Sequence, residues 1–186
     1  SLPHDFYNEP FKLALSSEQA NVDIYYTTDA STPDMTNGLL YSDSISIDKT
    51  TVVRAIAVVD GSTTSATTTC SYIFPENVFT QTEDQAGYPD TWLMPQDYMV
   101  YYDIETHYGV NQDVLQMNEV SQNIVSSLKS LPIISIVTDA DNLFSKSTDA
   151  DSGGIYMYSG EPLGSTSSLL YHLGRGWERP ASVEYF

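Results

Sequence analysis

Residues 20–33, which read ANVDIYYTTDASTP, decide the fold of the first half of this chain. Val22, Ile24 and Tyr26 alternate with their neighbours in the period-2 pattern of a β-strand. Asp29 can hydrogen-bond its own backbone, and Pro33 forces the residue before it into an extended conformation. The stretch therefore predicts one core strand followed by one shaped turn.

Further strands are predicted on both sides of this stretch. Asp60-Gly61 is a hairpin signal, because a type I′ turn needs positive φ at both of its central residues. Strands separated by about ten residues, with no helical pattern between them, predict a small β-sandwich. The stretches with strand character are residues 10–17, 40–47, 51–59 and 63–74.

The second half of the chain mixes patterns. Residues 75–96 break both periodicities and predict a loop or linker, and residues 97–107 fit a strand or a helix. Residues 118–131 predict a helix that Asn118 caps and Pro132 ends. Residues 133–137, IISIV, form a continuous apolar run, which predicts a strand buried on both faces. Residues 154–158 and 179–186 predict two further short strands. Because the chain stops within the last of these, we expect it to be a fragment of a longer protein.

The composition limits the classes of partner. With 7 Lys+Arg against 25 Asp+Glu, the formal net charge is −18, which disfavours nucleic acid and anionic membranes. Divalent cations, basic partners and neutral carbohydrate stay open. The single Cys70 excludes an internal disulfide and predicts a buried thiol. No apolar run approaches the roughly 20 residues of a membrane span, so we expect no membrane insertion. The sequence opens without a signal-peptide pattern, so either a signal has been removed or the protein never had one.

Residues 6–74 resemble the chitobiase/β-hexosaminidase C-terminal type of immunoglobulin-like module. The resemblance rests on residues 11–15, on 24–31 with Pro33, and on Tyr41, Ile45, Ile47, residues 50–51 and 54–55. The usual pattern has Gly where Ala30 stands, which matters only if that turn needs positive φ. The implied fold class is mainly β, with an immunoglobulin-like β-sandwich in residues 1–75, a linker in 76–96 and a small, truncated α+β segment in 97–186.

Residues 75–186 resemble the opening segment of the CotH (spore coat protein H) family. The motifs are Gly87-Tyr88-Pro89 with Thr91-Trp92, residues 131–139, 141–144, 154–156 and 176–184, in that order. The resemblance implies a link to an atypical kinase that phosphorylates secreted proteins, whose nucleotide and metal residues would lie beyond this segment. No Gly-rich phosphate loop or kinase catalytic-loop pattern occurs in the sequence. As an isolated chain, it is therefore not expected to be an enzyme.

Aromatic and acidic side chains supply the candidate site residues. Tyr25, Tyr41, Tyr88 and Trp92 are candidate ligand-binding residues, because exposed aromatic rings can stack on sugars. One of Tyr25 and Tyr26 must face the core, since neighbours in a strand point to opposite faces.

Two acidic residues are candidate metal ligands. Asp139 and Asp141, with Asp149 and Asp151 nearby, offer oxygen ligands to Ca²⁺, although Asp at a helix start commonly serves as a cap. We otherwise expect no cofactor and no catalytic residues, since His4, His107 and His172 stand alone in the sequence.

These features predict a non-catalytic structural or interaction module of a CotH-type protein, outside the cell or on its surface. Its expected partner is a protein or glycan surface. Self-association through an open strand edge is a further expectation. The alternatives are a carbohydrate-binding module and a fragment of a secreted CotH-like kinase.

Overall fold

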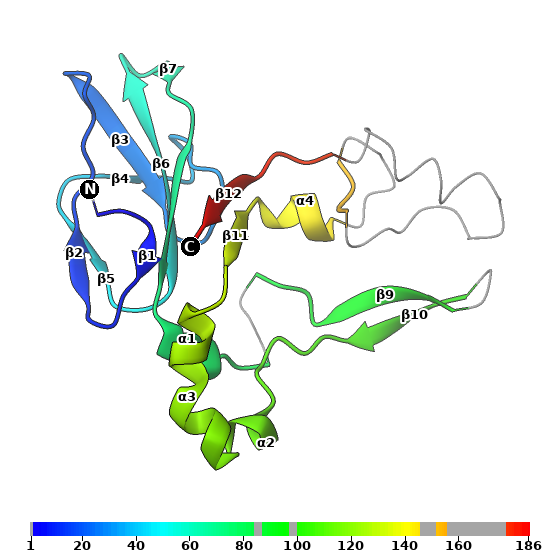
Figure 1. Cartoon of the computed structure of the whole chain (residues 1–186). Helices are drawn as coiled ribbons and strands as arrows, with labels where there is room; N and C mark the ends of the chain where they lie inside the picture. The colour runs from blue at the N-terminus through cyan, green and yellow to red at the C-terminus, as the bar shows by residue number, and fades with distance from the viewer. Residues whose placement is uncertain (1, 84–86, 97–99, 146–151, 156–177) are drawn as a thin grey trace. The chain divides into compact units, whose positions relative to one another are not determined.

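The computed structural model describes residues 2–83, 87–96, 100–145, 152–155 and 178–186 (Figure 1). The chain divides into two compact units. The first comprises Ser1–Gln81, Val110–Val137 and Ser182–Phe186, and the second comprises Thr82–Gly109 and Thr138–Ala181. The domain boundaries expected from the sequence, at residues 75 and 96, stay predictions.

The larger sheet of the first unit has six strands in the order β1-β8-β6-β3-β4, with β7 paired to β6. β1 runs parallel to β8, and the other pairs are antiparallel. The strands are β1 (Asp5–Phe6), β3 (Val22–Thr27), β4 (Leu39–Leu40), β6 (Thr51–Val59), β7 (Thr63–Thr64) and β8 (Thr68–Ile73). The strand predicted from residues 20–33 is therefore confirmed as β3.

A small sheet of β2 (Phe11–Leu13) and β5 (Ile45–Ile47) packs on the larger one. Their contact forms the hydrophobic core, which contains Leu13, Ile45, Ile47, Val53, Tyr72 and Phe74. Tyr26 packs against this core, so it is the member of the Tyr25/Tyr26 pair that faces inward. The predicted fold class, a mainly β chain with a sandwich and a small α+β part, is confirmed.

One predicted turn is confirmed, and two of the predicted strands were too long. Asp60 and Gly61 have φ of 50° and 67°, which confirms the turn with two positive φ values. The strand predicted over residues 63–74 is split into β7 and β8, and the strand over 40–47 is split into β4 and β5. Cys70 lies in a strand, β8, as expected, but its side chain is half-buried rather than buried.

Helices follow the sandwich in the first unit. They are α1 (Pro75–Phe79), α2 (Gln112–Leu115) and α3 (Asn118–Lys129), and α3 leads to the strand β11 (Ile134–Val137). The predicted helix over residues 118–131 is confirmed, although Met117 rather than Asn118 occupies the N-cap position. Residues 75–79 were expected in a loop. They form a helix because Pro75 stands at its start, where proline's fixed φ and missing N–H are tolerated.

The second unit contains the hairpin of β9 (Thr91–Gln96) and β10 (Val100–Glu105) and the short helix α4 (Ala140–Phe144). Residues 91–96 were expected in a loop, and the ambiguous residues 97–107 contain a strand. The strand predicted over 154–158 falls partly on residues 156–158, which lie outside the described residues. In the described part of the chain, no helix has the length and hydrophobicity to span a bilayer.

The loop after β3 is shaped by its own side chains. The Asp29 carboxylate accepts hydrogen bonds from the backbone N–H and the hydroxyl of Ser31, at 3.1 and 2.6 Å. The hydroxyl bond holds the pKa of Asp29 below its ordinary value. Between them, Ala30 has a φ of 66°, in the left-handed region that favours glycine, and its carbonyl accepts from the Arg54 guanidinium at 2.9 Å. The turn therefore needs a backbone conformation that strains an alanine.

Replacing Ala30 with glycine is expected to stabilise the protein. The left-handed conformation destabilises the folded state of a residue that has a Cβ by about 1–2 kcal/mol. Glycine avoids this strain, but the greater conformational entropy of its unfolded chain lowers the free energy of unfolding by about 0.4–1 kcal/mol. Ala30→Gly should raise the free energy of unfolding, measured by urea titration, by about 0.5–1 kcal/mol. Ala57→Gly in the middle of β6 is the matched control and should lower it. A loss of stability in Ala30→Gly would contradict this account.

Candidate interaction surface

Two of the predicted aromatic residues belong to the sandwich. Tyr25 is half-buried in β3, where it pairs with Leu40 and Ile56. Tyr41 is half-buried beside the core, and its ring meets that of Tyr26 edge-on, with 6.4 Å between ring centroids. Packing therefore accounts for Tyr41, and Tyr25 offers at most part of its ring to a ligand.

The other two predicted aromatic residues lie in the second unit. Tyr88 is 51% exposed, and its ring is held edge-on by Tyr108 and Phe144, at centroid distances of 5.3 and 5.5 Å. Trp92 lies in β9 and pairs through its backbone with Ile104. Tyr88 thus has a fixed ring with an accessible part, as stacking on a ligand requires.

Both candidate metal ligands lie at the start of α4. Asp139 is half-buried at the N-cap position, and Asp141 is exposed in the first turn. Among the described residues, no group of three or more His, Cys, Asp or Glu side chains is placed to hold a metal ion. Asp149 and Asp151 lie outside the described residues, and the Ca²⁺ site stays a prediction.

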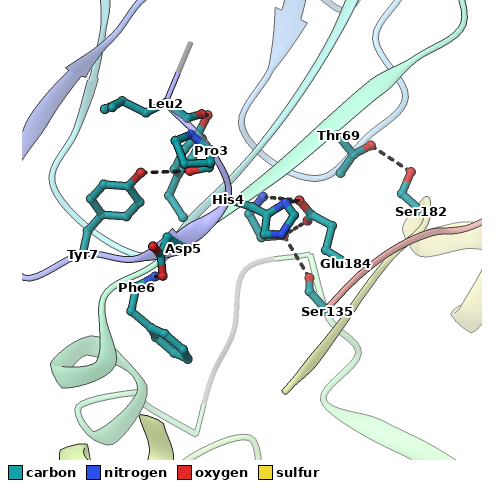
Figure 2. Close-up of polar contacts among 12 residues, drawn as sticks. Leu2, Pro3, His4, Asp5, Phe6, Tyr7, Thr69, Ser135, Ser182 and Glu184 are labelled. Atoms are coloured by element: carbon teal, nitrogen blue, oxygen red, sulfur yellow. Dashed lines mark hydrogen bonds and ion pairs between the residues drawn. The ribbon is translucent and has the colours of Figure 1, made fainter. Parts of the chain in front are cut away.

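A buried carboxylate joins the larger sheet to a two-stranded ribbon. The ribbon pairs β11 antiparallel with β12 (Ser182–Tyr185). From β12, Glu184 points inward and is only 8% exposed. Its oxygens accept hydrogen bonds from the Ser71 backbone N–H at 3.2 Å and the Ser71 hydroxyl at 2.5 Å, and Oε1 lies 3.2 Å from His4 Nδ1. Figure 2 shows Glu184 beside His4 and Ser135.

Half-buried hydroxyl groups on both sides of Glu184 continue its polar contacts into an inner row. Ser71 Oγ lies 2.9 Å from Ser135 Oγ, and Thr69 Oγ1 lies 2.8 Å from Ser182 Oγ (Figure 2). The single hydroxyl hydrogen of Ser71 goes to the carboxylate, so Ser135 is the donor to Ser71. In a Ser-His-acid triad the serine would instead hydrogen-bond to the histidine. Here Ser71 and His4 both contact Glu184 instead of each other, and the Ser71 hydrogen bonds hold the ribbon on β8.

The N-terminal segment closes over the end of the ribbon. The Phe186 ring lies 5.0 Å from the His4 ring and 5.6 Å from the Phe6 ring, measured between centroids. The backbone of Phe186 exchanges two hydrogen bonds with Ile133, at 2.9 and 3.3 Å. Lys129 of α3 lies over the Phe6 ring at 5.8 Å. The ribbon is therefore fixed both by its polar inner row and by aromatic contacts at its end.

The opposite face of the ribbon is apolar and exposed. Ile134 lies across from Tyr185, and Ile136 lies across from Val183. These four side chains are 60%, 67%, 68% and 66% exposed, in that order. Directly opposed residues in a sheet share one face, so the four form one contiguous patch, which we call the ribbon face. Soluble proteins rarely leave such a patch uncovered unless it is an interaction site.

The ribbon corrects the prediction that residues 133–137 are buried on both faces. Val137 is buried, but the exposure of Ile134 and Ile136 shows that one face is open. The polar Ser135 between the two isoleucines was the signal for this alternation, and Glu184 plays the same part between Val183 and Tyr185. Sequence reasoning missed these residues because the partner strand of each lies far away in the chain.

Comparison with known proteins identifies one part of the chain. Residues 2–69 match the family model of the chitobiase/beta-hexosaminidase C-terminal domain, and the match runs from β1 through β7 into β8. The family resemblance expected for residues 6–74 is thereby confirmed. No curated protein and no solved structure matches the chain. The resemblance of residues 75–186 to CotH proteins gains no support from these comparisons.

Removing the Glu184 carboxylate is expected to loosen the ribbon. Glu184→Ala leaves the two Ser71 donors without their acceptor and removes the carboxylate beside His4, at a cost of about 3 kcal/mol in the free energy of unfolding. Glu184→Gln keeps the shape and one oxygen acceptor, and should cost about half as much. Amide hydrogen exchange of β11 and β12 should accelerate in the same order. The control is the exposed Glu178→Ala, and equal stability of the two alanine variants would disprove the role of Glu184.

Proposed function

We propose that this chain is a non-catalytic interaction module of an extracellular or cell-surface protein, and that the ribbon face is its docking surface. The observation that carries the proposal is the contiguous exposed set of Ile134, Ile136, Val183 and Tyr185 on a ribbon anchored from behind. Residues 2–69 match a module that is named for chitobiase and beta-hexosaminidase, two enzymes that act on glycosides. This match supports the extracellular setting.

A rigid ribbon makes this face suitable for binding. Its inner row is hydrogen-bonded to β8, and Phe186 is packed between aromatic neighbours, so the ribbon loses little conformational freedom when a partner covers it. None of the four outer side chains is charged. The partner surface that fits is therefore apolar, and a second copy of the same face meets this condition.

Self-association through the ribbon face is expected to depend on salt. The net charge of −18 makes two copies repel each other, and raising the ionic strength from about 0.1 M to 1 M shortens the screening length from about 10 to 3 Å. Sedimentation velocity at several protein concentrations should therefore show dimers mainly at high salt.

One substitution separates the ribbon face from other exposed apolar positions. Ile136→Asp places a charge at the centre of the face and should abolish dimers at all salt concentrations. Leu40→Asp is the matched control, because Leu40 is 54% exposed on β4 and belongs to a different surface. A strictly monomeric wild type would refute self-association, and equal effects of the two substitutions would refute the role of the ribbon face.

Carbohydrate binding is the second candidate function. It is favoured by the family matched by residues 2–69 and by the fixed, half-exposed ring of Tyr88. Tyr88→Ala should then abolish retention on a panel of insoluble polysaccharides, whereas Tyr185→Ala should leave it unchanged. No retention of the wild-type chain on any polysaccharide would eliminate this candidate.

A third proposal rests only on the resemblance of residues 75–186 to the CotH family. In that case this chain is the opening part of a longer secreted kinase-like protein. The intact mass of the protein from its source tests the proposal, because a mass close to 20.6 kDa would end it.

A further inference from the structure

A hollow opens in the first unit where the two sheets of the sandwich cease to face each other. β6 is nine residues long, whereas β2 and β5 have three residues each. The small sheet therefore covers only part of the inner face of the larger one. Beyond its edge lies a cavity of about 240 Å³.

The floor of this cavity continues the hydrophobic core. Val53, Ala55 and Ala57 line it from alternate positions of β6, and so from one face of the strand. In the sheet register, Cys70 lies opposite Val53 and Ile24 lies opposite Ala57. Because two of the three β6 residues that line the cavity from this face are alanines, the chain itself leaves this part of the core unfilled.

The mouth of the cavity is polar but uncharged. Ser16, Ser17, Ser65 and Thr68 line it. The Ser65 hydroxyl is already engaged, since it accepts from the Ala57 N–H at 3.0 Å and donates to the Ala66 carbonyl at 2.9 Å. The two ionisable lining residues, Cys70 and Tyr72, are a thiol and a phenol, whose ordinary pKa values already lie above 7, and burial raises the pKa of each further. Among the described residues that line the cavity, none therefore carries a charge.

We propose that this cavity is a binding site for a small uncharged aromatic molecule. Protein interiors are close-packed, and an apolar cavity of about 150 Å³ stays dry and takes up benzene. This cavity is larger and open to solvent, so a benzene-sized ring fits the apolar floor while one uncharged polar substituent reaches the hydroxyls at the mouth. The site lies on residues separate from the ribbon face, and its existence does not depend on the function proposed above.

A titration with benzyl alcohol tests the site. In ¹H–¹⁵N spectra of the wild-type chain, we expect saturable shifts confined to amides of β6, β8 and residues 15–17. Benzoate, which has the same ring and a negative charge, should cause none of them. Benzylamine controls for attraction to the acidic surface, and its shifts should disappear at high salt while those of benzyl alcohol persist.

A cavity-filling variant locates the binding. Ala57→Leu fills the floor and should abolish the benzyl alcohol shifts, whereas Ala66→Leu, at an exposed position, should preserve them. If Ala57→Leu does not fold, the wild-type thiol gives a second measurement, because bound benzyl alcohol should slow modification of Cys70 by a neutral thiol reagent. Absence of saturable shifts, persistence of the shifts in a folded Ala57→Leu variant, or an unchanged rate at Cys70 would overturn the proposal.

Discussion

The buried carboxylate of Glu184 is the constraint on which the ribbon and its exposed apolar face depend. A carboxylate largely shielded from water is tolerated only when other polar contacts replace its hydration, and here two hydrogen bonds from Ser71 do so, with the His4 ring 3.2 Å away. Their positions fix which residue of β12 points inward. Since side chains alternate along a strand, Val183 and Tyr185 must then point outward. The exposed apolar face is therefore a direct result of the polar interior behind it.

The arrangement reverses the usual distribution of side chains in a ribbon laid on a sheet. Ribbons normally bury their apolar face, because burial of apolar area is the main favourable term in folding. Here the inner row consists of the half-buried Ser135 and Ser182 and the buried Glu184, with Thr69 and Ser71 of β8 opposite. Hydrogen-bond geometry, rather than apolar area, thus holds the ribbon, and the apolar side remains available for a partner.

Local patterns predicted the sandwich well and the ribbon poorly. The alternation in residues 20–33 and the Asp60-Gly61 turn depend on nearby residues alone. The strand β3 and the turn between β6 and β7 could therefore be predicted from the sequence. The strain at Ala30 was foreseen only as a condition, because φ at that residue is set by the contacts of Asp29 and Arg54. The burial of residues 133–137 was predicted wrongly, since which face is covered depends on β8 and β12. The half-buried location of Tyr41 beside the core likewise required the packing of both sheets.

The contacts of Ser71 also set an order of assembly. Its partner Ser135 is 64 residues away along the chain, and its partner Glu184 is 113 residues away. Contacts between such distant residues form late, because the entropy of closing the intervening loop must be overcome first. On a ribosome adding about 5–20 residues per second, the sandwich strands are complete roughly 5–20 s before Glu184 is made. The two sheets of the sandwich therefore have time to pair before the ribbon forms. Until Glu184 has been synthesised, the Ser71 hydroxyl and N–H are hydrogen-bonded to water.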